Sequence, residues 1–247
     1  MYNFQKNWHK NNSDKKGYKL KKKNLLILFG FIFLCICMNN IYYKKGTTKA
    51  ITNVNEKEDK IVIDDLKTTY NNEEIVGYLR IPGTELSVPI TQATDNDKYL
   101  HKDIYGNDDE KGNPFLDYRV DINSSKKLLI FGHNAKRYEA PFKILENYYD
   151  ENFYKDHKYI ELVTDKNIFR YKIFSVYIET GDWSYMRLDY DDWSKELEKY
   201  KLKSFYDTGE IAAPEDDILL MQTCSTNERY SKYSKKYLLI ISRRVEN

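Results

Sequence analysis

Short β-like runs separated by turns are the feature that most limits the fold of this chain. From Ile75 onward, apolar, β-branched and aromatic stretches alternate with polar breaks that contain glycine or proline. The runs expected to be strands are Val76–Ile81, Leu86–Ile90, Asn113–Tyr118, Leu128–Phe131, Tyr159–Val163, Phe169–Ile178, Ile218–Thr223 and Tyr237–Ser242. About eight strands at these spacings favour a barrel or sandwich over a sheet of βαβ units.

Few helices are expected in the same part of the chain. Asp64 and Asp65 favour the start of a short helix, and Ala140–Tyr149 and Glu151–His157 can each form one or two turns. The strongest helical pattern covers Asp191–Ser204, where apolar side chains recur at helical spacing after an acidic first turn. This helix would lie in a long crossover between two strands.

A basic segment followed by an apolar one begins the chain. Residues 1–23 carry eight lysines and one aspartate, about +7 of a whole-chain charge of +2. Leu25–Met38 is apolar without a charge, and Tyr42 and Tyr43 suit a membrane interface. The length suits a signal-peptide core about as well as a span, but no small-x-small cleavage site follows. We therefore expect an uncleaved signal anchor over residues 24–43.

This topology divides the chain into four parts. They are a basic cytoplasmic tail (1–23), a transmembrane anchor (24–43), a juxtamembrane linker (44–64) and an extracellular domain (65–247). The exported part is mildly acidic, so it offers no extended basic face for nucleic acid. The histidines and cysteines do not share a metal-ligand spacing, so we expect neither a metal nor another cofactor.

One cysteine, Cys224, lies outside the apolar segment and directly follows the run Ile218–Thr223. The exported part therefore cannot form an internal disulfide, and an unpaired thiol outside the cell points to reactivity. A small buried hydrophobe is the alternative reading of this cysteine. His133 follows another strand-like run, Leu128–Phe131, and a nearby histidine can take a proton from a thiol. Cys224 and His133 thus form a candidate catalytic pair.

Several segments resemble the motifs of one known enzyme family. Leu220–Cys224 resembles the TLxTC signature of sortases, and Phe131–Asn134 is similar to their histidine turn. The segments that resemble class B sortases in particular are Asp95–Asp103, Gly112–Asp117 and the helical stretch Asp191–Ser204 before the cysteine strand. The resemblance covers about residues 74–244, and the order and spacing of the motifs make it specific.

The resemblance implies both a fold and a reaction. The fold would be mainly β, a closed eight-stranded β-barrel with a few peripheral helices, preceded by an N-terminal transmembrane helix. The enzyme would be a transpeptidase that cleaves a C-terminal sorting signal of secreted proteins, as in Gram-positive bacteria. Cys224 would attack the carbonyl of the signal's threonine and hold an acyl-enzyme, with His133 as general acid and base. The incoming nucleophile would be the amine of a cell-wall peptidoglycan precursor.

The same resemblance implies a groove for the signal peptide. Its lining residues would be Asn96, Leu100, Phe131, Gln222 and Thr223. Taken singly, each of these residues is explained about as well as an ordinary barrel or turn residue.

One position departs from the family pattern. Sortases open the last strand with an arginine close to the cysteine, whereas this strand opens with lysines, including Lys236. Arg243 and Arg244 are too distant to serve, roughly 20 Å along the strand at ~3.3 Å per residue. We expect Arg229, five residues after Cys224, to supply the catalytic cation, with Lys236 as the alternative.

Two other functions stay open at this stage. If no cation serves Cys224, the chain would be a catalytically silent sortase-like barrel that binds sorting signals or scaffolds surface assembly. A cysteine hydrolase that releases the acyl group to water is a third possibility. A reactive thiol that depends on His133 would separate the enzyme from the scaffold, and an added amine acceptor would separate transfer from hydrolysis.

Overall fold

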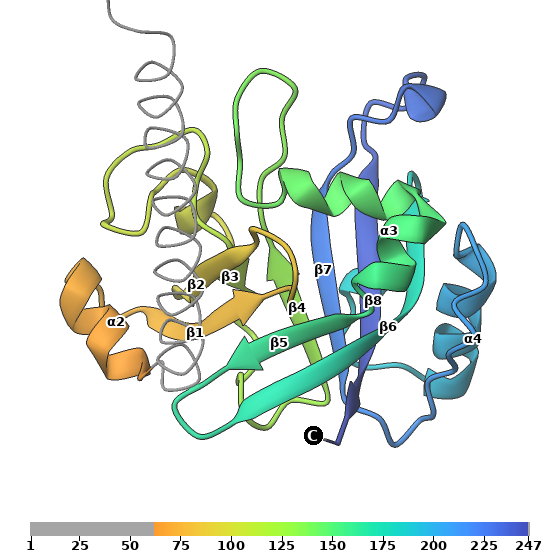
Figure 1. Ribbon diagram of the computed structural model, residues 1–247, viewed down its shortest axis with the longest axis horizontal. Coiled ribbons are helices and arrows are strands. Elements are labelled where there is room, and N and C mark those ends of the chain that lie inside the picture. The colour runs from red at the N-terminus through yellow and green to blue at the C-terminus, as the bar shows by residue number, and fades with distance from the viewer. Residues whose placement is uncertain (1–61, 247) are drawn as a thin grey trace, which may run out of the picture. The chain divides into compact units, whose positions relative to one another are not determined.

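A closed barrel of eight strands forms the centre of the protein, as the spacing of the β-like runs predicts (Figure 1). The computed structural model describes residues 62–246. The strands are β1 (Ile75–Arg80), β2 (Ser87–Thr91), β3 (Phe115–Leu116), β4 (Lys127–Phe131), β5 (Tyr159–Val163), β6 (Ile168–Glu179), β7 (Ile218–Cys224) and β8 (Tyr237–Val245). Around the barrel they follow the order β1-β2-β3-β4-β7-β8-β6-β5, and β5 pairs with β1 to close it.

The pairing of β4 with β7 determines where the chemistry can occur. These two strands run parallel, although 86 residues separate the end of β4 from the start of β7. A parallel pair requires a long crossover connection, and here that connection contains β5, β6 and several helices, including α3 and α4. Because the strands are parallel, their C-terminal ends meet at one edge of the barrel. Phe131 pairs with Gln222 at that end.

Helices surround the barrel. They are α2 (Ile63–Tyr70), α3 (Glu151–Asp156), α4 (Trp193–Lys203) and the 3₁₀ helices η1 (Lys98–Leu100), η2 (Lys143–Tyr149), η3 (Trp183–Met186) and η4 (Glu228–Tyr230). Helix α4 buries Leu197 and Tyr200 in a cluster that also contains Leu220 of β7. Two positions of its predicted apolar face therefore contact the barrel, and α4 covers the outer side of the sheet (Figure 1).

Alternation along β7 separates two apolar clusters. Leu219 and Met221 belong to the cluster to which all eight strands contribute, whereas Ile218 and Leu220 belong to the cluster beneath α4. Because successive side chains of a strand point to opposite faces, the side chains of Gln222 and Cys224 continue the outer face. Cys224 therefore projects toward the outside of the barrel wall rather than into its core.

Some element boundaries differ from the sequence-based prediction. The expected strand Asn113–Tyr118 retains only the two residues of β3, because the residues at both of its ends make side-chain contacts with backbone groups instead. The Asn113 side chain donates to the Pro89 carbonyl at 3.2 Å, and Asp117 accepts from the backbone N–H of Arg119 at 3.0 Å. The expected helix Ala140–Tyr149 begins only at Lys143 and is a 3₁₀ helix.

The C-terminal strand is longer than predicted and extends to Val245. Arg243 and Arg244 therefore lie within β8, where they pair with Glu210 and Asp217 respectively, each at 3.0 Å. These contacts agree with the expectation that neither arginine serves the cysteine.

The N-terminal predictions fall mostly on another part of the chain. The expected tail (1–23) and membrane anchor (24–43), and nearly all of the linker, lie outside the described residues. Helix α2 starts at Ile63 with Asp64 and Asp65 in its first turn, as expected. Between residues 62 and 246, no helix is long and apolar enough to cross a membrane.

Candidate active site

Cys224 is the last residue of β7, and its thiol is exposed. It is the free cysteine among residues 62–246, and it pairs with Tyr237 at the start of β8. Although the residue is exposed, desolvation by neighbouring protein atoms raises the pKa of the thiol. The positive charge of Lys236 acts in the opposite direction and favours the thiolate.

His133 lies two residues after the end of β4, and β4 is the strand that pairs with the cysteine strand β7. The backbone N–H of Gly132 donates to the carbonyl of Gln222 at 3.1 Å, which continues the β4–β7 ladder by one residue. The hydroxyl of Thr223 also donates to the Gly132 carbonyl at 2.8 Å. Extending the register of Phe131 with Gln222 by two residues pairs His133 with Cys224. The structure thus brings the candidate pair to neighbouring strand ends.

Contacts of the His133 ring determine which nitrogen can exchange a proton. Its Nε2 lies 2.9 Å from the backbone carbonyl of Leu100. A carbonyl oxygen only accepts, so Nε2 must carry a hydrogen and, in the neutral ring, Nδ1 has the free lone pair. Leu100, which was predicted to line the groove, therefore also orients the histidine through its backbone.

Gly112 lies close to the same edge of the His133 ring, beside the Leu100 carbonyl. Its φ of +58° lies in the left-handed region. A Cβ at this position would lie 2.3 Å from the Tyr99 carbonyl oxygen and 3.1 Å from Cδ2 of His133. Glycine is therefore required both by the backbone conformation and by the close approach.

Asn134 connects the histidine loop to the cysteine. Its Nδ2 donates to the backbone carbonyl of Cys224 at 2.9 Å, and the residue is buried. Its Oδ1 is buried and has no hydrogen-bond partner within the described part of the chain. The residue after the candidate base thus holds the backbone of the candidate nucleophile.

The two candidate cations lie in different surroundings. Lys236 is half-buried, its carbonyl accepts from the N–H of Ser225 at 3.0 Å, and its charge acts on the Cys224 thiol. Arg229 is exposed in η4 and lines a cavity of about 340 Å³ together with aromatic residues that include Phe205 and Tyr230. No contact between Arg229 and Cys224 is present among the described residues.

The residues predicted to line a peptide groove divide into two groups. Leu100 and Phe131 lie together in an apolar cluster with Phe115, and Gln222 continues the same outer barrel face. Asn96 accepts from the N–H of Tyr118 at 3.0 Å, and Thr223 is only 1% exposed. The structure therefore assembles Leu100, Phe131 and Gln222 beside the pair, whereas it engages Asn96 and Thr223 in contacts within the protein.

The crossover between β6 and α4 supplies a further wall near Cys224. The hydroxyl of Tyr185 in η3 donates to Oε1 of Gln222 at 2.8 Å, and the ring of Trp183 lies 5.5 Å from that of Tyr237. The Cys224 charge contributes to raising the pKa of Tyr185, after the larger effect of burial.

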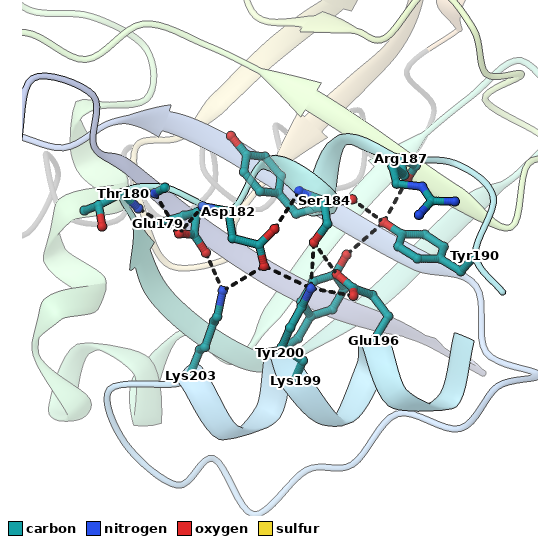
Figure 2. A network of polar contacts seen from close by, with 12 residues as sticks. Glu179, Thr180, Asp182, Ser184, Arg187, Tyr190, Glu196, Lys199, Tyr200 and Lys203 are labelled. Atoms are coloured by element: carbon teal, nitrogen blue, oxygen red, sulfur yellow. Dashed lines mark hydrogen bonds and ion pairs between the residues drawn. The ribbon is translucent and has the colours of Figure 1, made fainter. Parts of the chain in front are cut away.

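A network of ion pairs holds this crossover on α4 (Figure 2). Lys203 of α4 pairs with Glu179 at 2.5 Å, and Lys199 contacts Asp182 at 3.1 Å and Ser184 at 2.6 Å. Glu179 also accepts from the N–H groups of the three residues that follow it. The part of the crossover that directly precedes Tyr185 is therefore anchored to α4.

The sequence matches a known domain family over most of the barrel. The family model of the sortase domain covers residues 79–243, more than half of the chain. This chain belongs to the sortase family. The matched range includes both strands of the candidate pair and the crossover between them, and the enzyme is a sortase-type cysteine transpeptidase.

The relatives indicate class B within the sortases. Sortase B of Listeria monocytogenes is 32% identical over 197 residues, which cover 78% of this chain and 77% of that protein. Sortase B of Staphylococcus aureus is 29% identical over 173 residues, or 68% of this chain and 70% of the relative. These similarities confirm the class B assignment.

Solved structures agree with the sequence matches. The Staphylococcus aureus sortase B–substrate complex superposes with a TM-score of 0.68 at 25% identity, covering 82% of this chain and 94% of that chain. Sortase B from Listeria monocytogenes gives a TM-score of 0.62 at 28% identity, covering 71% and 97%. The closed mixed barrel is therefore the sortase fold.

Sequence reasoning missed several residues of this sortase site. Asn134 directly follows the histidine in the motif, so its position offered a signal. Tyr185 contacts Gln222, and Glu146 of η2 accepts from the backbone N–H of Thr226. Both come from segments far from Cys224 in the sequence, so only the fold brings them near. No group of three or more metal-ligating side chains occurs within residues 62–246.

Proposed function

We propose that this sortase is a membrane-anchored enzyme that cleaves a C-terminal sorting signal of secreted proteins and transfers them to a cell-wall amine. The observation that carries the proposal is the parallel pairing of β4 with β7, because the chain reaches His133 and Cys224 at the adjacent C-terminal ends of these two strands. The expected anchor over residues 24–43 would keep the N-terminus in the cytoplasm and residues 65–247 outside. The similarity of the fold to a Staphylococcus aureus sortase B–substrate complex supports a substrate site in this barrel.

In the first half-reaction, the Cys224 thiolate attacks the carbonyl carbon of the signal's threonine. The bond from sulfur to carbon forms, and the bond from that carbon to the following amide nitrogen breaks. Nδ1 of His133 carries the proton that it took from the Cys224 thiol, and it donates this proton to the leaving amine, which departs with the C-terminal fragment. The Leu100 carbonyl supports Nδ1 as the nitrogen that exchanges the proton, because it accepts the hydrogen bond from Nε2.

In the second half-reaction, a peptidoglycan-precursor amine attacks the thioester carbonyl. His133 takes the proton from this amine, a new amide bond forms, and Cys224 leaves as the thiolate. The acceptor must reach the thioester before water does, since water attack would release the acyl group as a free acid. Transfer rather than hydrolysis therefore requires the amine to be bound near His133.

We assign the cation of this site to Lys236 in preference to Arg229. Lys236 is favoured by its effect on the Cys224 thiol and by its place at the start of β8. An ammonium is a point charge without the two-pronged hydrogen bonding of a guanidinium, so it would stabilise the thiolate and oxyanion less specifically than an arginine.

The signal peptide would lie along the outer face formed by Leu100, Phe131 and Gln222, with Tyr185 on the crossover side. Asn96 and Thr223 would support the groove through their contacts within the protein rather than touch the peptide.

Peptide turnover tests this proposal. The full-length protein is incubated with a panel of threonine-containing sorting peptides, with and without an added amine acceptor. Wild type should yield a product joined to the amine, Cys224→Ala should yield none, and His133→Ala should be ~10²–10⁴-fold slower. Equal turnover by Cys224→Ala would refute the enzyme assignment. A wild-type protein that binds the peptide without cleaving it would favour the alternative of a catalytically silent barrel that binds sorting signals.

A further inference from the structure

The segment directly after Cys224 is held by a single carboxylate from η2. Oε1 of Glu146 accepts from the backbone N–H of Thr226 at 2.6 Å, and its Oε2 accepts from the Thr226 hydroxyl at 2.6 Å. Oε1 also accepts from the hydroxyl of Tyr149 at 3.1 Å. Glu146 thus makes three contacts, two of which fix the second residue after the cysteine.

The same cluster continues to the residue next to Cys224. The Tyr149 hydroxyl lies 2.8 Å from Oγ of Ser225, and Ser225 Oγ accepts from the N–H of Asn227 at 3.2 Å. A carboxylate only accepts, so the Tyr149 hydrogen points to Glu146 and Ser225 must donate to Tyr149. Each hydroxyl hydrogen in this chain of contacts therefore has one direction.

The helix that carries Glu146 is firmly anchored. Leu145 and Tyr148, its neighbours in η2, and Phe142 just before η2 are each 0% exposed and belong to the barrel core. The N–H of Phe142 also donates to the carbonyl of His133 at 3.2 Å. One rigid element therefore contacts the backbone after the cysteine and the backbone of the histidine.

From this geometry we propose that Glu146 is a positioning residue for the reaction at Cys224. Its contacts hold Thr226 directly and Ser225 through Tyr149, and with them the direction in which the thiol leaves the end of β7. This inference rests on the proposed role of Cys224 as nucleophile. Displacing a reacting group by about 1 Å can slow a reaction ~10²-fold, so losing these contacts lowers the rate of acyl-enzyme formation.

Two substitutions separate the hydrogen bonds from the charge. Glu146→Ala removes all three contacts. Glu146→Gln keeps them, because its carbonyl can accept from Thr226 N–H and Tyr149 while its amide donates to the Thr226 hydroxyl. The hydrogen-bonding account therefore predicts that glutamine rescues the activity that alanine loses.

The test is single-turnover acylation of Cys224 by a sorting peptide that wild type accepts, with thermal unfolding of each variant. We expect Glu146→Ala to lower the acylation rate about 10–100-fold. The peptide concentration at half-maximal rate should change less than about threefold, and Glu146→Gln should stay within about threefold of wild type. Glu151→Gln is the matched control, since Glu151 pairs with Lys155 on the neighbouring helix. It should behave as wild type.

A folded Glu146→Ala variant that acylates at the wild-type rate would overturn the inference while leaving the proposed function intact. If Glu146→Gln acylates as slowly as Glu146→Ala, the hydrogen-bonding inference is also overturned, and the negative charge of Glu146 is what matters. If Glu146→Ala does not fold, Thr226→Val takes its place in the test. We then expect the acylation rate to fall several-fold, and a wild-type acylation rate in Thr226→Val would contradict the inference. If wild type itself forms no acyl-enzyme, the proposed function fails first, and the inference with it.

Discussion

The side-chain amide of Asn134 donates a 2.9 Å hydrogen bond to the backbone carbonyl of Cys224, so the histidine loop also holds the cysteine. This contact crosses between two strands that are parallel neighbours in the barrel. With the contacts of Thr223 to Gly132 and of Gly132 to Gln222, it makes the two strand ends one rigid unit. The pair therefore needs no folding of a mobile loop to come together.

Replacing Asn134 by alanine should loosen this unit. The loss of the bond leaves the Cys224 carbonyl without this donor, which costs about 1–3 kcal/mol of unfolding free energy. We also expect a roughly tenfold slower acylation, since the nucleophile is less well oriented. Urea unfolding together with single-turnover acylation checks both effects. Wild-type stability and rate in Asn134→Ala would show that the contact is dispensable.

The two candidate cations make opposite predictions for thiol reactivity. Lys236→Ala removes a positive charge that favours the thiolate, so the pKa of Cys224 should rise further and alkylation at neutral pH should slow. Peptide turnover should fall about 10–100-fold. Arg229→Ala should change neither the pH profile of alkylation with iodoacetamide nor the turnover by more than about twofold. The reverse pattern would restore Arg229 as the cation.

Much of this fold is visible in the sequence because short apolar runs alternate with polar turns. The runs that become β4 and β7 carry continuous apolar residues, and His133 and Cys224 come at or just after their C-terminal ends, so the Cys/His pair could be predicted. The register between β4 and β7, which brings the two residues together, could not be predicted, because it depends on a long crossover that includes β5, β6 and α4.

Lys127 shows a limit of the same reasoning. A lysine at the start of a strand-like run is expected at the surface, yet this one is 4% exposed. Its ammonium donates to the carbonyls of Tyr185 and Arg187, at 2.5 and 2.9 Å, and to the hydroxyl of Tyr190 at 2.5 Å. These acceptors all come from the crossover, which no local pattern connects to β4.

Burial of Lys127 should make stability depend on pH. Chiefly through desolvation, the pKa of Lys127 falls from 10.5 to about 7 in the folded protein. Between these values the unfolded chain binds a proton that the folded protein does not, so the unfolding free energy rises with pH. Below about pH 7 both states are protonated and this dependence ends.

Urea unfolding at pH 6 to 9 measures the effect against Lys127→Met. Relative to this variant, wild type should gain up to about 1.4 kcal/mol per pH unit above pH 7. Parallel pH profiles for the two proteins would contradict a lowered pKa for Lys127.

Two glycines with left-handed backbones provide a matched pair. Gly106→Ala, at φ +82° with open space around it, should cost about 1–2 kcal/mol from backbone strain alone. Gly112→Ala adds a clash with the Tyr99 carbonyl and pressure on the His133 ring, so it should cost roughly 2–5 kcal/mol and slow acylation. Chemical unfolding and acylation of both variants check this. Equal effects of the two substitutions would show that the Gly112 contact does not position the ring.

The central claim, that Cys224 forms an acyl-enzyme with a sorting signal, is tested most directly by intact-protein mass spectrometry. The protein is incubated with threonine-containing sorting peptides, quenched in acid and weighed. The account predicts an added mass equal to the peptide fragment that ends at threonine, on wild type but not on Cys224→Ala, and removed by an amine acceptor. An adduct that persists in Cys224→Ala, or cleavage by wild type without any adduct on Cys224, would contradict it.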